Sequence, residues 1–283
     1  MGCGKGPTVG WLWLLPLAWA ACGPGPAPGQ RPTVVVSVPP QAWLVDRLAH
    51  GLVDLVVMVP PGANPATFAP ELAERRALER ASLYVKVGHP HFPFEAAWLD
   101  RLLRERPDLP VVDAARGLTA FENDPHLWLS PSHMAALTGP LANALARLLP
   151  MKADEIRKRE SALRGELATT DVRLREIFRE SRGRTFLVLH PAWGYLADEY
   201  GLVQLAIQRE NREPDPQWLA EVIGRAAALG IEVVFSQPHL DPASARVVAE
   251  AIGARVEAID PLARDWHRNL VHVAERLAAE ARG

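Results

Sequence analysis

Histidine is the residue type in this sequence whose placement most suggests chemistry, because a neutral imidazole is a common metal ligand. The chain holds nine histidines, and five of them fall in loops that follow short β-branched runs. Imidazole nitrogens together with a carboxylate form a ligand set that suits zinc and that manganese tolerates. The five histidines are His89, His91, His126, His190 and His239.

The elements that must position these histidines are short β-branched runs, which alternate with longer helical patterns from Thr33 onward. Four runs precede the middle of the chain and four follow it, so we expect an α/β fold of two lobes. Each lobe would be a mostly parallel four-stranded sheet flanked by helices, and ligands of such sheets bind beyond the carboxyl ends of the strands. The predicted strands are 33–38, 54–59, 82–87, 109–113, 185–189, 202–207, 231–235 and 254–259.

A charged segment, 151–182, separates the N-terminal lobe (33–150) from the C-terminal lobe (183–283). Its apolar residues recur at spacings of three, four and seven, which predicts one long amphipathic helix. At 1.5 Å per residue the helix would span about 45 Å and would restrict hinging between the lobes. Two helices broken near Gly165 or at 169–170 are the alternative.

The first 32 residues are expected to lie outside the fold. Lys5 and the apolar run 11–21, which is too short for a membrane span, predict a signal peptide over 1–21. Residues 17–22 (LAWAAC) resemble a bacterial lipobox, which implies that Cys22 carries a lipid. The stretch 22–32, rich in proline and glycine, then predicts a flexible tether to the membrane. A plain signal peptide with an incidental cysteine is the alternative.

Composition bounds the class of protein. Hydrophobic residues make up 48% of the chain and charged residues 23%, which is typical of a globular protein with enough apolar material for two modest cores. The formal net charge of −2 lacks the basic excess that nucleic-acid binding requires. Of the two cysteines, Cys3 would leave with the signal peptide and Cys22 would be lipidated, so no disulfide is expected.

Four motifs in a fixed order resemble the zinc and manganese solute-binding proteins of ABC transporters, over nearly the whole mature chain. They are PPGANPATFAP at 60–70, DPHLWLSP at 124–131, HPAWGYLADEYGL at 190–202, and IDPL at 259–262 with RNL at 268–270. The resemblance implies two lobes joined by a rigid helix, with a metal ion held between them by histidines and acids. It also implies a membrane permease as partner, a monomeric receptor, and a location in the periplasm or at the outer face of the cytoplasmic membrane.

Residue by residue, the resemblance assigns His126 as the ligand from the first lobe, His190 as the ligand from the second and Asp260 as the carboxylate. The departure is Ala66, which stands where the family has a histidine. We favour His91 in the neighbouring HPH sequence as the substitute, with His89 as the other candidate. A water ligand, or loss of tight metal binding, are the remaining outcomes.

Other residues receive structural interpretations. His239 precedes Leu-Asp-Pro and is expected to help the following helix begin, and Asp260 before proline could simply form a turn. Trp128 and Trp193 flank the assigned ligands and are expected, with Ala66, to wall the site and exclude water. The tryptophans expected in the core are Trp43, Trp98, Trp218 and Trp266.

The favoured function is a receptor, not an enzyme: it binds Zn(II), or alternatively Mn(II), and delivers the ion to a permease. Because Ala66 cannot coordinate, a receptor of the same fold for a metal chelate or an anion is an alternative. A zinc hydrolase is a further alternative, which would need a general base beside the metal. The sequence has no HExxH or GxSxG motif, and only Glu122 and Asp124 are candidates for that base.

Overall fold

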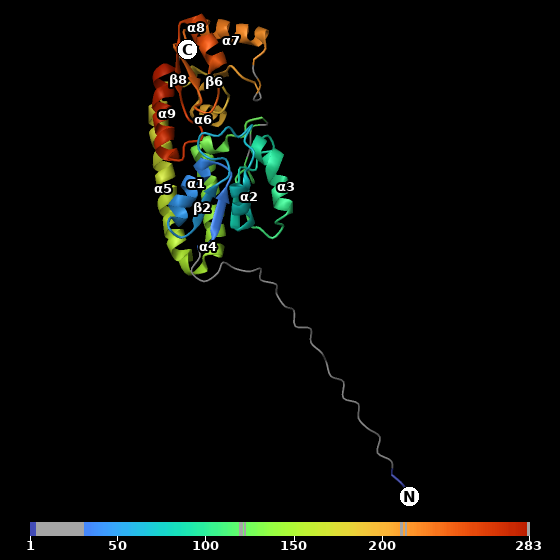
Figure 1. Cartoon of the computed structure of the whole chain (residues 1–283). Coiled ribbons are helices and arrows are strands. Elements are labelled where there is room, and N and C mark those ends of the chain that lie inside the picture. The colour runs from blue at the N-terminus through green and yellow to red at the C-terminus, as the bar shows by residue number, and fades with distance from the viewer. Residues whose placement is uncertain (4–30, 119–120, 122, 210–211, 213, 282–283) are drawn as a thin grey trace. The chain divides into compact units, whose positions relative to one another are not determined.

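Two parallel four-stranded sheets form the framework of the protein in a computed structural model (Figure 1). The first sheet, in the order β2-β1-β3-β4, contains β1 (Thr33–Val36), β2 (Asp54–Val57), β3 (Ala81–Lys86) and β4 (Val111–Asp113). The second repeats this order as β6-β5-β7-β8, from β5 (Thr185–Val188), β6 (Val203–Ala206), β7 (Val233–Ser236) and β8 (Arg255–Ala258). All eight predicted strands are confirmed within two residues at each end, and so is the α/β fold of two lobes. We call the part built on β1–β4 the first lobe and the part built on β5–β8 the second lobe.

The structure describes residues 1–3, 31–118, 121, 123–209, 212 and 214–281. Most of the predicted signal peptide, Cys22 and all of the predicted tether except residues 31 and 32 lie outside the described residues, as does Glu122. In the described part of the chain, no helix is both long enough and apolar enough to cross a membrane.

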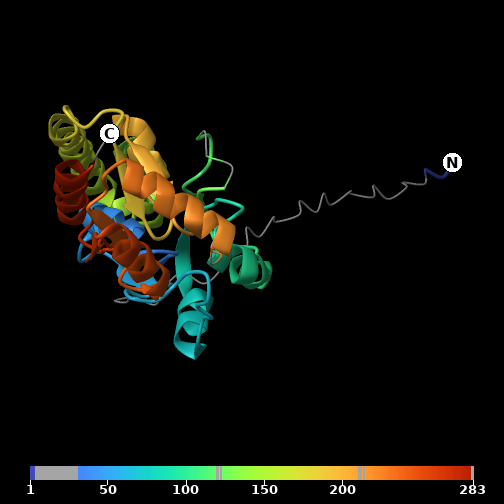
Figure 2. The ribbon, with the colours of Figure 1, turned by 90° about the horizontal axis from the view of Figure 1, so that it is seen from above.

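Helices cover both sheets (Figures 1 and 2). In the first lobe α1 and α4 pack on the sheet, and α2 also contacts three of its strands. In the second lobe α8 packs on β7 and β8. The described α-helices other than the central one are α1 (Pro39–Ala49), α2 (Leu72–Glu79), α3 (Asp100–Arg104), α4 (Pro131–Leu148), α6 (Gly194–Tyr200), α7 (Pro216–Ala228), α8 (Ala243–Ile252) and α9 (Trp266–Glu280). Short helices of other types are the π-helix η1 (Glu95–Leu99) and the 3₁₀-helices η2 (Leu127–Leu129) and η3 (Pro150–Lys152).

The central helix α5 runs unbroken over Ala153–Ile177, through Gly165, so the prediction of one helix is confirmed. It is shorter than the predicted 151–182, because η3 precedes it and turns follow Phe178. Its 25 residues extend about 37 Å. The helix packs against α1 and α4 of the first lobe and α9 of the second, and Arg47 and Arg173 form ion pairs across these contacts. It therefore braces both lobes.

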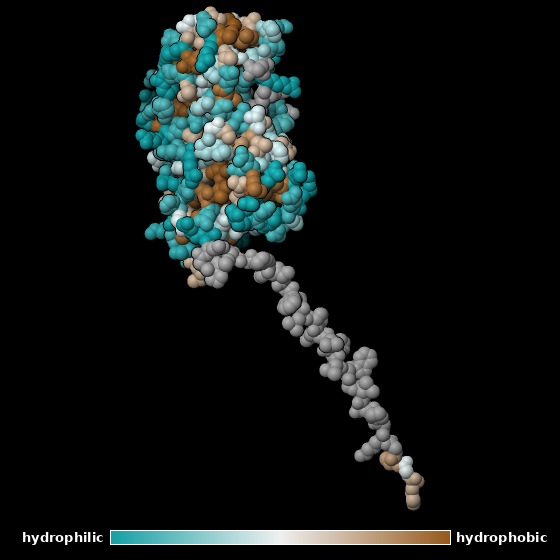
Figure 3. Space-filling model, viewed as in Figure 1, coloured by the Kyte–Doolittle hydropathy of each residue, from teal (hydrophilic) through white to brown (hydrophobic). Residues whose placement is uncertain are grey.

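Buried contacts also join the lobes directly, since one apolar cluster continues from the first sheet to the second. Trp266 at the start of α9 lies 5.1 Å from Trp43 of α1, between ring centroids, and its Nε1 donates to the carbonyl oxygen of Trp128 at 2.7 Å. Of the tryptophans predicted for the core, Trp43, Trp218 and Trp266 are buried, whereas Trp98 is only partly buried. The surface in Figure 3 is mostly hydrophilic, as expected when apolar side chains gather inside.

Candidate metal centre

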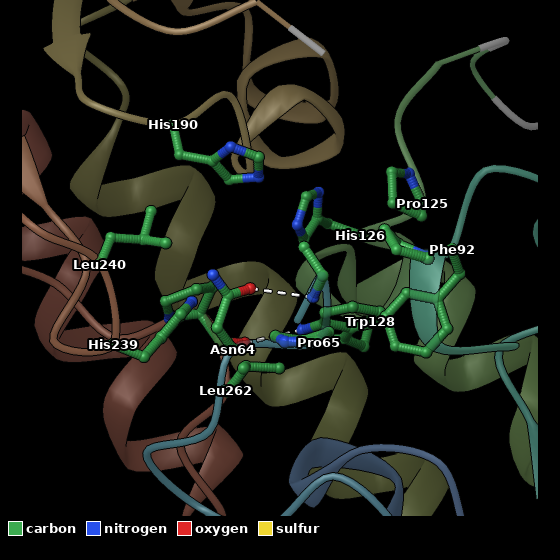
Figure 4. A pocket seen from close by; sticks show the side chains of 13 residues that line it. Asn64, Pro65, Phe92, Pro125, His126, Trp128, His190, His239, Leu240 and Leu262 are labelled. Atoms are coloured by element: carbon green, nitrogen blue, oxygen red, sulfur yellow. Dashed lines mark hydrogen bonds between the residues drawn. The ribbon is translucent and has the colours of Figure 1, made fainter. Parts of the chain in front are cut away.

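A cavity of about 30 Å³ lies where loops at the carboxyl edges of the two sheets meet (Figure 4). We call it the interlobe cavity. Its volume suits one ion with a water or two, since one water needs at least about 10–15 Å³. Its lining combines three imidazoles with a mainly apolar wall. The lining residues are Asn64, Pro65, Ala66, Phe92, Pro93, Pro125, His126, Trp128, His190, His239, Leu240, Pro261 and Leu262.

His126 enters the interlobe cavity from the first lobe and is oriented by Asp124. One carboxylate oxygen, Oδ1 of Asp124, accepts hydrogen bonds from the backbone N–H of His126 at 2.9 Å and from its ring Nδ1 at 2.7 Å. A carboxylate only accepts, so Nδ1 carries the proton and Nε2 keeps a lone pair for a metal ion. A histidine paired with a carboxylate in this way is a typical metal ligand, with fixed tautomer and raised basicity.

The loop that holds Asp124 is tied to the second lobe through Tyr195. The Tyr195 hydroxyl donates to the carbonyl oxygen of Asp124 at 2.9 Å and accepts from the backbone N–H of Phe121 at 2.9 Å. A Cβ at position 194 would lie only 2.5 Å from Oδ2 of Asp124, so Gly194 is needed for α6 to approach this loop. The close approach of α6 to Asp124 therefore explains why glycine stands at this position of the HPAWGY motif.

His190 follows β5 and reaches the interlobe cavity from the second lobe. Its ring centroid lies 5.2 Å from that of His126, and it is 8% exposed. Nε2 of Gln237 donates to its carbonyl oxygen at 3.0 Å, and the Gln208 side chain hydrogen-bonds its ring. Burial, reinforced by His126 and His239, lowers the pKa of His190 to about 3. The imidazole is thus neutral at physiological pH, the form that binds metals.

Asp260 lies beside the interlobe cavity and is not among its lining residues. Its Oδ1 accepts from the backbone N–H of Leu262 at 2.8 Å, and its carbonyl oxygen accepts from Nδ2 of Asn269 at 2.7 Å. The aspartate therefore does form the turn that its position before Pro261 suggested. Its charge also acts on the neighbouring His239, where it partly opposes the lowering of the pKa that burial causes.

The structure does not bring His89 and His91 to the interlobe cavity. The buried His89 ring uses both nitrogens locally: Nδ1 accepts from the backbone N–H of His91 at 3.2 Å, and Nε2 donates to the carbonyl oxygen of Phe121 at 2.9 Å. His91 is exposed, whereas Phe92 directly after it is buried against Trp128. The backbone of this turn directs Phe92 inward and leaves His91 outside the lining of the interlobe cavity.

His239 is the residue of the site that sequence reasoning placed elsewhere. It lines the interlobe cavity with His126 and His190, and helix α8 begins later, at Ala243. Oδ1 of Asp241 accepts from the backbone N–H of Ala243 at 3.0 Å. The expectation that His239 starts the helix is therefore wrong, because Asp241 makes that contact. The available signal was that His239 follows a strand, as His190 does.

The pKa of His239 is lowered, first by burial and also by the nearby His126, while Asp260 opposes the shift. A second imidazole of the cavity is therefore held toward its neutral form. His190 and His239 lie in the loops that follow the adjacent strands β5 and β7 of the same sheet.

Two of the three residues predicted to wall the site do line the interlobe cavity, and the third does not. Ala66 and Trp128 line the interlobe cavity, and the Trp128 ring centroid is 5.3 Å from that of His126. Nε1 of Trp128 donates to the carbonyl oxygen of Pro261 at 2.7 Å, which links the lobes at the cavity. Trp193 is fully buried in the apolar cluster instead, with its backbone N–H donating to Oε1 of Gln204 at 2.8 Å.

Within the described ranges, no three His, Cys, Asp or Glu side chains stand close enough together to hold a metal ion. The candidate centre is a facing pair of imidazoles, His126 and His190, from different lobes, with His239 and Asp260 nearby. His126 and His190 also line a larger neighbouring cavity of about 290 Å³, together with Asn123, Asp124 and Gln204. An ion held by this pair would therefore need further groups to move inward to complete its coordination.

Two α/β lobes braced by one helix, with imidazoles from both lobes in the cavity between them, are the arrangement of a metal solute-binding protein. Residues 34–279 match the family model described as zinc-uptake complex component A, periplasmic. The chain belongs to this family. The resemblance drawn from the four motifs is thereby confirmed.

Known proteins and structures agree with this assignment. A crystal structure of ZnuA superposes with a TM-score of 0.84 at 34% identity, covering 89% of this chain and 99% of that one. A ZnuA deletion mutant with zinc bound gives a TM-score of 0.84 at 33% identity, with 90% and 99% covered. The high-affinity zinc uptake system protein ZnuA of Yersinia pestis is 24% identical over 89% of this chain and 90% of its own length.

Proposed function

We propose that this protein is the receptor of an ABC importer, which captures a zinc ion outside the cytoplasmic membrane and delivers it to a membrane permease. The observation that carries the proposal is the pair His126 and His190, which come from different lobes with ring centroids 5.2 Å apart. Each is prepared as a ligand: His126 by the Asp124 carboxylate, and His190 by burial. Asp260, beside the cavity, supplies negative charge and is the proposed carboxylate ligand.

Zinc is favoured as the cargo because imidazoles with one carboxylate suit it, whereas manganese prefers oxygen ligands. The solved relatives support the same metal, since one of them is a ZnuA variant with zinc bound. An interlobe cavity of about 30 Å³ favours a bare ion over a metal chelate. Manganese remains the second candidate cargo.

Capture without catalysis is the proposed mode of action. A zinc hydrolase would need a general base beside the metal, and Asp124 already accepts two hydrogen bonds from His126 on one oxygen. Coordination and release of the ion require only that the walls of the cavity approach and separate. The protein is proposed to work as a monomer anchored by a lipid at Cys22.

Calorimetry with zinc and manganese, after elemental analysis of the purified protein, tests the proposal. We expect stoichiometric zinc binding at submicromolar affinity, weaker manganese binding, and no turnover of ester or peptide substrates with zinc present. If neither zinc nor manganese binds at micromolar concentration, the proposal is refuted. Turnover of an ester or peptide substrate would favour the hydrolase.

The proposed anchor is tested separately by expressing the full chain and its Cys22→Ala variant in a bacterial host. The parent chain is expected in the membrane fraction after cell disruption, and the variant in the released fraction. Equal partition of the two would refute lipid anchoring at Cys22 while leaving the metal-binding proposal intact.

A further inference from the structure

The interlobe cavity holds one more imidazole than the sequence assigns to metal binding. Ala66 and His239 line the same cavity, although they come from different lobes. The first lobe thus offers only a methyl group at the position where a ligand is missing, while the second lobe offers a nitrogen ligand facing the same space. Figure 4 shows His239 and Leu240 bordering the opening beside Asn64, with His126 and His190 further along it.

The backbone that carries His239 is joined to the backbone that carries His190. The backbone N–H of Leu189 donates to the carbonyl oxygen of Phe235 at 2.7 Å, and Nε2 of Gln237 donates to the carbonyl oxygen of His190 at 3.0 Å. These bonds hold the loop after β7 against the loop after β5. The two histidines of the second lobe therefore occupy neighbouring, mutually supported positions at one sheet edge.

His239 lies near both a carboxylate and another imidazole of the cavity. It interacts electrostatically with Asp260 and with His126. Its side chain is partly buried and lines the interlobe cavity. A cation bound by His126 and His190 would also be attracted by the Asp260 carboxylate, and His239 would have to move closer to complete its coordination.

We propose that His239 is a metal ligand of this chain and supplies the imidazole that Ala66 cannot. The inference rests on the proposed function of metal capture and deepens it by naming a ligand. Three imidazoles and one carboxylate form a set that favours zinc over manganese more strongly than two imidazoles and one carboxylate. His239 therefore contributes to selectivity as well as affinity.

The test compares the His239→Gln variant with the parent protein by competition against a chromophoric zinc chelator. Glutamine keeps the side chain polar and similar in size, so the fold is preserved, and equal melting temperatures without metal would verify this. Loss of one ligand is expected to weaken zinc binding roughly a hundredfold. The matched control is His50→Gln, because His50 is exposed at the end of α1, and its zinc affinity should equal that of the parent.

Cobalt substitution separates ligation from a merely structural role. The visible absorption of bound Co(II) reports the number and type of its ligands, so the spectrum of His239→Gln is expected to differ from that of the parent. A double variant, Ala66→His with His239→Gln, returns an imidazole to the same cavity from the other lobe. We expect it to recover most of the lost zinc affinity.

The results distinguish failure of metal binding by the protein from failure of the role proposed for His239. If the parent protein binds neither Zn(II) nor Co(II) at micromolar concentration, the proposed function fails. If the parent binds zinc and His239→Gln binds it equally well, or binds Co(II) with an unchanged spectrum, only the role of His239 is overturned.

Discussion

The two lobes repeat one architecture but contribute unequally to the interlobe cavity. Both sheets have the same strand order, and both direct their carboxyl-edge loops at the cavity. The first lobe supplies a single imidazole, His126, and an otherwise nonligating wall that includes Ala66. The second supplies His190 and His239, with Asp260 beside them. A repeated fold thus does not impose a repeated chemistry, because binding residues are carried by loops that vary independently of the framework.

The support behind each ligand differs as well. His126 is held by a carboxylate, Asp124, whereas His190 is held by neutral amides, Gln237 at its backbone and Gln208 at its ring. A carboxylate makes an imidazole a stronger electron donor, while burial keeps an imidazole unprotonated. The first lobe therefore offers one proposed ligand with strong support, and the second offers several proposed ligands in a more buried setting.

The largest expected effect comes from removing either facing imidazole. Four ligands share a zinc-binding free energy of about 10–16 kcal/mol, so one ligand contributes about 3 kcal/mol, or roughly a hundredfold in affinity. His126→Gln should lose at least this much, because the first lobe has no second imidazole in the cavity wall. His190→Gln should lose somewhat less, with His239 still present in the second lobe. Competitive titration of zinc measures both, and equal affinity of either variant and the parent would contradict the site.

A smaller effect is expected from the carboxylate behind His126. Asp124→Asn keeps an oxygen acceptor for Nδ1 but removes the charge, so zinc affinity should fall by about 10–100-fold. Asp108→Asn, at an exposed aspartate beside Arg106, is the matched control and should bind zinc normally. Should Asp124→Asn bind as tightly as the parent, the asymmetry of support between the lobes would be disproved.

The effect of the hydrogen bond that joins the lobes at the cavity can be distinguished from the effect of a similar hydrogen bond within one lobe. Trp128→Phe removes the Nε1 donor to Pro261 of the other lobe, and Trp218→Phe removes an equivalent donor to Ile207 within the second lobe. Each variant should lose about 1 kcal/mol of unfolding free energy. Chemical denaturation of the metal-free proteins measures this loss. Zinc titration should then show weaker binding for Trp128→Phe but not for Trp218→Phe. Equal zinc affinities of the two variants would argue that the interlobe hydrogen bond does not shape the cavity.

The smallest expected effect concerns the histidine favoured from sequence as a substitute for the missing ligand. His91 is exposed and lies outside the cavity lining, so His91→Gln should bind zinc with the affinity of the parent. A loss approaching that of the His126 variant would instead show that the loop 88–93 moves into the cavity. The zinc affinity of this variant therefore shows whether the first lobe contributes a second imidazole to the site.

Much of this protein was determined by the sequence alone. Runs of β-branched residues placed all eight strands, and the spacing of apolar residues such as Leu163 and Leu167 predicted one central helix. These features depend on local periodicity, which a sequence displays directly. His126 and His190 were predicted as ligands from the resemblance of their motifs to a known family, and these two roles stay predictions.

Only the tertiary structure decided which other histidine stands at the cavity. In sequence, His91 and His239 look alike, since both lie in proline-containing loops after strands. The order β6-β5-β7-β8 places the loop of His239 beside that of His190, where Gln237 holds it. In the loop of His91, the backbone N–H of His91 donates to the ring of His89, and the His91 ring is left exposed to solvent. Which way a loop side chain points depends on strand order and on hydrogen bonds between distant residues, and neither is encoded in local spacing.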